Sequence, residues 1–116
     1  MQKVTIWHNA RCSKSRQTLQ LLEENNIEAE VVKYLNEENS VENITDILKK
    51  LGISAKELLR DGEEDYKRLN LKEEMDETVL IQAMVDFPKL IQRPIVIVGD
   101  KAMLGRPPEK VLELFN

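Results

Sequence analysis

The stretch KVTIWHNARCSKSRQTLQLLEENNIEAEVVKY, residues 3–34, decides the fold class of this chain. Residues 3–7 are β-branched and aromatic and predict a strand. The part that follows Ser15 places Leu19 and Leu22 one turn apart and ends in two asparagines, which predicts a helix. Residues 30–34 predict a second short strand. This order is typical of a parallel βαβ unit, so we expect an α/β fold.

Residues 40–87 change to a helical pattern. A first helix is predicted by apolar residues at helical spacing, namely Val41, Ile44, Leu48 and Leu51. A last helix is predicted over residues 76–87, with Val79, Ala83 and Phe87 facing inward. Between them, ISAKELLRDG (residues 53–62) predicts a short helix with Ser54 and Glu57 as a capping box and Gly62 as its end.

The chain then returns to strands. PIVIV (residues 94–98) predicts a buried strand, which a turn at residues 99–101 joins to a strand over residues 102–104. RPPEKVLELF (residues 106–115) begins with two prolines that suit a first helical turn, and predicts a helix that buries Val111, Leu112 and Phe115. The expected order is βαβ, inserted helices, ββα.

Length and composition limit the possible functions. A chain of 116 residues is the size of one domain. It has no apolar run long enough to span a membrane and no signal peptide pattern, so we expect a cytoplasmic protein with no membrane partner. Its net charge of −4 disfavours binding to nucleic acid. A single cysteine permits no internal disulfide, so disulfide chemistry would require a thiol from another molecule.

The only tryptophan, histidine and cysteine of the chain lie between Trp7 and Cys12. Cys12 is expected at the first turn of a helix, where the helix dipole favours a thiolate. The alternative is that the lone cysteine is only a small buried apolar residue. Its polar and basic flanks favour a reactive thiol instead. The flanking groups expected to assist the thiolate are Arg11, Lys14, Arg16 and, if it is protonated, His8, with Ser13 and Ser15 as hydrogen-bond donors.

Other kinds of site are disfavoured. One cysteine and one histidine cannot form a usual zinc site, and the scattered glycines form no nucleotide-binding loop. Phosphatase-like loops place an arginine six residues after the cysteine, where this chain has Thr18. An oxyanion would need guanidinium groups, and the candidates are Arg60, Arg93 and Arg106. Each arginine also has an alternative role without a ligand. Arg93 and Arg106 could form surface salt bridges, and Arg60 could interact with the dipole at the end of a helix.

The stretch HNARCSKSRQTL (residues 8–19) resembles the HN-P-x-C-x-x-S-R-x-T-L signature of the glutaredoxin-coupled arsenate reductases, the ArsC family. RPIVI and GRPPEKVLELF resemble its C-terminal motifs. Residues 86–109 resemble in particular a branch of uncharacterised bacterial proteins considered arsenate reductases by similarity. The resemblance implies a thioredoxin-like fold at about residues 1–38 and 90–116, with an inserted helical subdomain at about residues 39–89.

The resemblance also implies roles for individual residues. Cys12 would be the nucleophile, and Arg60, Arg93 and Arg106 would bind the oxyanion. His8 and Ser15 would tune the thiolate, while Asn9 and Arg16 would shape the loop. Pro94 would follow a cis peptide bond and face Cys12. Ala10 departs from the family, which usually has proline there.

The implied mechanism starts with attack of the Cys12 thiolate on arsenate. Glutathione would then be the co-substrate and glutaredoxin would resolve the mixed disulfide, with arsenite as the product. We expect a monomer without a bound cofactor or metal. Two other functions stay open: a glutathione-dependent monothiol oxidoreductase, because residues 12–15 also resemble a C-x-x-S site, and an RNA-polymerase-binding redox regulator, in which Ser15 would preclude an internal thiol switch.

Overall fold

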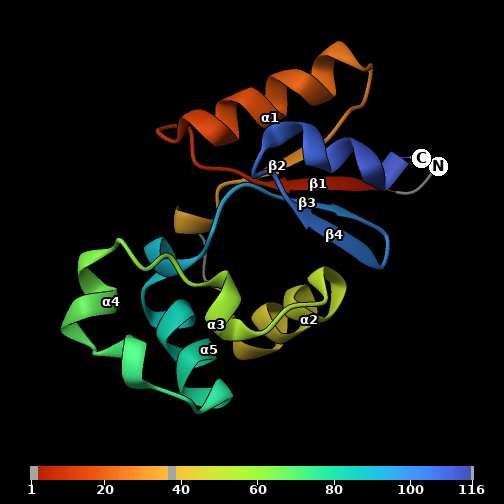
Figure 1. The fold of residues 1–116 in the computed structure, drawn as a ribbon. Helices are drawn as coiled ribbons and strands as arrows, with labels where there is room; N and C mark the ends of the chain where they lie inside the picture. The colour runs from red at the N-terminus through yellow and green to blue at the C-terminus, as the bar shows by residue number, and fades with distance from the viewer. Residues whose placement is uncertain (1–2, 37–38, 116) are drawn as a thin grey trace. The chain divides into compact units, whose positions relative to one another are not determined.

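A computed structural model describes residues 3–36 and 39–115 of the chain. It divides into two compact units. The first comprises residues 1–36 and 93–116 and is called the sheet unit, and the second comprises residues 37–92 and is called the helical unit (Figure 1). No helix in the described ranges is long and apolar enough to cross a membrane.

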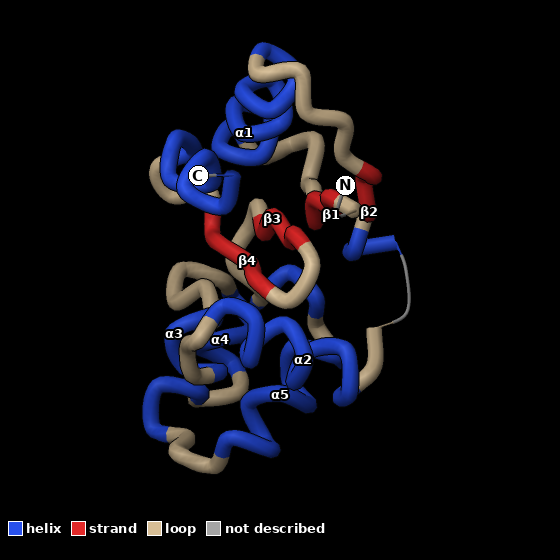
Figure 2. Tube along the Cα trace, turned by 90° about the vertical axis from the view of Figure 1, so that its right-hand side faces the viewer, coloured by secondary structure: helices blue, strands red, loops and turns tan. Residues whose placement is uncertain are grey.

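The sheet unit contains a four-stranded sheet with the order β2-β1-β3-β4 (Figure 2). Its first strand β1 (Val4–Trp7) pairs in parallel with β2 (Glu30–Val32). On its other side β1 pairs antiparallel with β3 (Ile95–Val98), which forms a hairpin with β4 (Lys101–Leu104). The predicted βαβ start and terminal hairpin are confirmed. The second strand ends earlier than predicted, because residues 34–36 form a short 3₁₀ helix, η1 (Tyr34–Asn36).

The core of the sheet unit lies where the sheet meets the helix α1 (Ser13–Glu24) and the 3₁₀ helix η4 (Pro108–Phe115). Figures 1 and 2 show both helices on the same side of the strands. Side chains alternate across a strand, so the residues at one face of β1 and β3 share this core. Its fully buried members are Ile6, Leu22, Val96 and Val111.

The last helix differs from the prediction in its period. Residues 108–115 form a 3₁₀ helix, which has about three residues per turn, and residues three apart therefore share one face. Pro108 and Val111 are buried and Leu114 packs against the core. The expected burial of Phe115 is wrong, since 37% of it is exposed, and Leu112 is only partly buried.

The helical unit contains α2 (Val41–Leu51), α3 (Ala55–Leu58), α4 (Glu64–Arg68) and α5 (Glu77–Asp86). Two 3₁₀ helices, η2 (Leu71–Glu73) and η3 (Pro88–Leu90), complete it. Helix α2 is capped by Ser40, whose side chain accepts a hydrogen bond from the Asn43 N–H at 3.1 Å. The glycine that follows α2 is left-handed, as is common at helix C-termini.

Helix α3 begins as predicted but ends earlier. The Ser54 side chain caps it by accepting a hydrogen bond from the Glu57 N–H at 3.4 Å. The helix ends at Leu58 instead of near Gly62, because the next residue is extended and pairs with Ile91 in an antiparallel bridge. Arg60 therefore follows this bridge and does not lie in the last turn of a helix.

The inward face of α5 was predicted wrongly in part. Ala83 is buried, but 43% of Val79 is exposed. The buried side chains are Leu80, Ile81, Ala83 and Met84. In α2, Ile44 and Leu48 are buried as predicted, together with Ile47, whereas 37% of Val41 is exposed.

Candidate active site

The loop between β1 and α1 holds the cysteine. Cys12 is the N-cap residue of α1, with extended backbone angles. Its N–H donates to the Asn9 carbonyl oxygen at 2.9 Å, and the Arg11 N–H donates to Asn9 Oδ1 at 3.0 Å. Asn9 thereby closes a tight turn that brings the thiol directly to the start of the helix.

Two residues of α1 hold the same loop from the helix side. Ser15 is fully buried, and its Oγ accepts a hydrogen bond from the Asn9 N–H at 3.3 Å. The Arg16 guanidinium donates to the Ala10 carbonyl oxygen at 2.8 Å. The structure thus places Asn9, Ser15 and Arg16 in the loop framework.

The surroundings of Cys12 favour a thiolate. The largest single effect on its pKa is burial, which raises it. This effect is outweighed by the backbone N–H of Ser15, a hydrogen bond from the Arg93 side chain, the backbone N–H of Lys14 and the positive charge of Arg93, so the pKa of the Cys12 thiol lies below its ordinary value. The N–H groups of Ser15 and Lys14 belong to the first turn of α1, directly after the Cys12 N-cap.

A second guanidinium reaches the thiol from the C-terminal segment. Arg106 Nη2 lies 3.9 Å from Cys12 Sγ, and Arg106 Nε donates to the Arg93 carbonyl oxygen at 3.0 Å. The peptide bond between Arg93 and Pro94 is cis, as the resemblance implies. Cys12, Arg93 and Arg106 therefore meet within the sheet unit and can surround a small anion with positive charge.

His8 follows β1, and its backbone N–H donates to the Val32 carbonyl oxygen at 2.9 Å. Only 8% of it is exposed, and no described residue forms a hydrogen bond with its Nδ1. Burial, then the charges of Lys33 and Arg16, lower the pKa of His8 below its ordinary value. The lowered pKa disfavours the protonated imidazole, the form in which His8 would assist the thiolate by its charge. Its role as a tuning residue stays a prediction.

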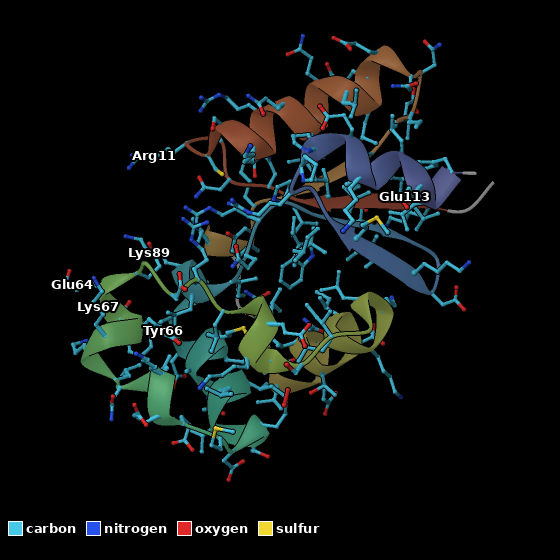
Figure 3. The ribbon with its side chains drawn as sticks, in the orientation of Figure 1. Arg11, Glu64, Tyr66, Lys67, Lys89 and Glu113 are labelled. Atoms are coloured by element: carbon cyan, nitrogen blue, oxygen red, sulfur yellow. The ribbon has the colours of Figure 1, made fainter. Side chains whose placement is uncertain are left out.

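Two other arginines, Arg11 and Arg60, were predicted to act on the thiol or on the oxyanion. Arg11 is exposed and points away from the loop into solvent (Figure 3). Arg60 belongs to the helical unit, where its backbone N–H donates to the Leu90 carbonyl oxygen at 2.8 Å. The part of Arg60 in oxyanion binding stays a prediction. Within the described ranges, no cluster of three or more histidine, cysteine or acidic residues could hold a metal ion.

The sequence interpretation missed the supports of this site. Thr18 was considered only as a mismatch with phosphatase loops, and Gly105 was given no role. Both are buried and lie against each other, with Pro94 beside them. This contact joins segments that are distant in the chain, so no local pattern could have revealed it.

Comparison with known proteins identifies the family. The model of the ArsC family matches residues 7–114. The uncharacterised protein YfgD of Escherichia coli K12 is 55% identical over 116 residues, which cover 98% of each chain. An arsenate reductase of Haemophilus influenzae is 47% identical over 97% of this chain and 98% of its own.

A solved structure gives the same result at the level of the fold. The arsenate reductase from Vibrio cholerae superimposes with a TM-score of 0.93 at 46% identity, over 97% of each chain. The sheet and its helices therefore form a thioredoxin-like fold, as predicted. On the family match and these relatives, this chain belongs to the ArsC family.

Proposed function

We propose that this protein reduces arsenate to arsenite, with Cys12 as the nucleophile. The observation that carries the proposal is the approach of two guanidinium groups to one thiol of lowered pKa, those of Arg93 and Arg106. Relatives that are named arsenate reductases, at 47% and 46% identity, support this choice of substrate.

Cys12 begins the reaction as a thiolate. Its sulfur attacks arsenic, an As–S bond forms, and one arsenate oxygen leaves as water after protonation. The guanidinium groups of Arg93 and Arg106 neutralise the oxyanion and stabilise its charge during the displacement. In our proposal Arg60 is the third member of this set.

Reduction of arsenic requires a second thiol, because the chain has only one cysteine. We propose that glutathione supplies it. When Cys12 and glutathione become a mixed disulfide, two electrons pass to arsenic, which leaves as arsenite. Glutaredoxin then attacks the disulfide and regenerates the Cys12 thiol.

The decisive experiment follows NADPH oxidation in an assay that contains arsenate, glutathione, glutaredoxin and glutathione reductase. We expect arsenate-dependent oxidation with the wild type and none with Cys12→Ser. If the wild type reduces a glutathione mixed disulfide but not arsenate, the protein is a monothiol oxidoreductase and the proposal is wrong. Omission of glutaredoxin alone tests the reductant.

Arg93→Lys tests the oxyanion site in the same assay. An ammonium keeps the charge but cannot make a planar two-point contact, so we expect KM for arsenate to rise about tenfold or more. Arg68→Lys is the matched control, because the Arg68 guanidinium is bonded to Asp65 at 3.0 Å. Equal values of KM and kcat for the two variants would show that Arg93 does not bind the oxyanion.

A further inference from the structure

Gly105 has a closer environment than an ordinary loop glycine. A Cβ atom at this position would lie 2.5 Å from Thr18 Oγ1 and 2.7 Å from Pro94 Cγ. The backbone of Gly105 is not left-handed, so an alanine would be sterically excluded by its neighbours and not by its own backbone angles. The position therefore needs a glycine because of tertiary packing.

Both neighbours of Gly105 are held firmly. Thr18 is fully buried, and its hydroxyl donates to the Lys14 carbonyl oxygen at 2.8 Å. Pro94 is buried in its cis conformation, and its carbonyl oxygen accepts the Gly105 N–H at 3.0 Å. Neither a hydrogen-bonded buried threonine nor a proline ring can easily move aside.

Each residue of this contact is hydrogen-bonded to, or adjacent in sequence to, a residue that acts on the Cys12 thiol. The Thr18 hydroxyl donates to the carbonyl oxygen of Lys14, in the first turn of the helix whose N-cap is Cys12. Pro94 follows Arg93, and Gly105 precedes Arg106. The three segments that supply the sulfur and the two guanidinium groups thus meet at one point.

We infer that Gly105 and Thr18 are positioning residues, whose close contact sets the distances of Arg93 and Arg106 from Cys12. The inference rests on the proposed function in one respect, namely that the positioned thiol and guanidinium groups act on arsenate. The contact acts through the guanidinium groups, since Arg106 is also anchored on the Arg93 carbonyl oxygen and a displaced residue 105 shifts both.

The test measures the thiolate of Cys12 and needs no arsenate turnover, so its failure is distinct from failure of the proposed function. The rate of alkylation by iodoacetamide is followed against pH for Gly105→Ala. We expect its midpoint to rise by about half a pH unit or more, which corresponds to about threefold less thiolate below the midpoint. Protection of the thiol by added sulfate should weaken in parallel.

Gly62→Ala is the matched control, because no described atom beyond its two chain neighbours would come within 4 Å of a Cβ atom at Gly62, and its backbone is not left-handed. Its alkylation profile should equal that of the wild type. An unchanged profile for folded Gly105→Ala, with the circular dichroism spectrum of the wild type, would overturn the inference.

Removal of the Thr18 hydroxyl and methyl keeps the test decisive if Gly105→Ala does not fold. Thr18→Ala combined with Gly105→Ala relieves the 2.5 Å approach and leaves the one to Pro94. We expect the double variant to fold, and we expect the pH midpoint of its Cys12 alkylation to be higher than that of Thr18→Ala alone. Identical profiles for these two variants would contradict a positioning role of Gly105.

Discussion

Cys12 has a lowered pKa because of where a turn and a helix place its side chain. The N–H groups of Ser15 and Lys14 act with Arg93 to lower its pKa against the opposing effect of burial. In the unfolded chain these groups are dispersed, and the thiol returns to its ordinary pKa. The difference between the two states can be measured in two independent ways.

The first measure is chemical. We predict that the alkylation of Cys12 by iodoacetamide has its pH midpoint at a lower pH in the folded protein than in the same chain in urea, because only the folded chain stabilises the thiolate. The midpoint should rise in Arg93→Lys. Coinciding midpoints for the folded and unfolded wild type would contradict the described surroundings.

The second measure is the free energy of unfolding. A depressed thiol pKa contributes stability that is complete above the unfolded pKa and is lost as pH falls through the folded pKa. Relative to Cys12→Ser, the wild type should therefore gain stability as pH rises through that window, by at most about 1.4 kcal/mol per pH unit. Urea unfolding at a series of pH values provides the comparison.

At this scale the sequence was informative about the thiol and its loop. A helix N-terminus and its neighbours are local in sequence, so Cys12 and Ser15 could be recognised there, whereas the role of Asn9 in the loop came from the family resemblance. The contact of Arg93 and Arg106 with the sulfur depends on chain folding, and the family resemblance was needed to select them. Gly105 has no local signal at all.

Among the elements, α5 shows why periodicity can mislead. Its apolar residues lie on more than one side, and the helical repeat permits an inward face through Val79 or through Leu80. The structure selects Leu80, Ile81, Ala83 and Met84. Only tertiary packing decides between such faces.

Two adjacent residues of α5 therefore give a paired prediction. Leu80→Ala should lower the free energy of unfolding by about 2–5 kcal/mol, because it empties a buried site. Val79→Ala should change it by less than about 0.5 kcal/mol, since much of Val79 is already exposed. Urea unfolding measures both, and equal losses would place the inward face elsewhere.

Helix η4 is a second element whose buried face was predicted wrongly in part. Two prolines and a run of apolar residues predicted a helix correctly, but not its type. Val111 is buried as predicted, but with three residues per turn its partners at the core are Pro108 and Leu114 instead of Leu112 and Phe115. A sequence pattern of eight residues is too short to distinguish these periods.

For the molecule as a whole, the sequence predicted α/β class and the order of elements. It could not give the order of the strands, because β1 pairs with β3 across most of the chain. Such pairing depends on contacts that no window of sequence contains. The family match covers residues 7–114 and therefore spans the segments that this pairing joins.

Global stability should depend strongly on the small core of the sheet unit. A domain has a total stability of about 5–15 kcal/mol, and Leu22→Ala should remove about 2–5 kcal/mol of it. The fluorescence of Trp7, the single tryptophan, would report the urea transition. Gln17→Ala, at an exposed position of the same helix, should leave the midpoint nearly unchanged.

The long separation between Cys12 and Arg106 has a consequence for the chain during its synthesis. The two residues are 94 positions apart, and Arg93 is also made late. A nascent chain on the ribosome thus exposes Cys12 with neither guanidinium beside it, and the thiol remains mostly protonated and slow to oxidise. The contribution of the two guanidinium groups to the thiolate is therefore added only when strand β3 and the segment after β4 have been made and have joined the sheet.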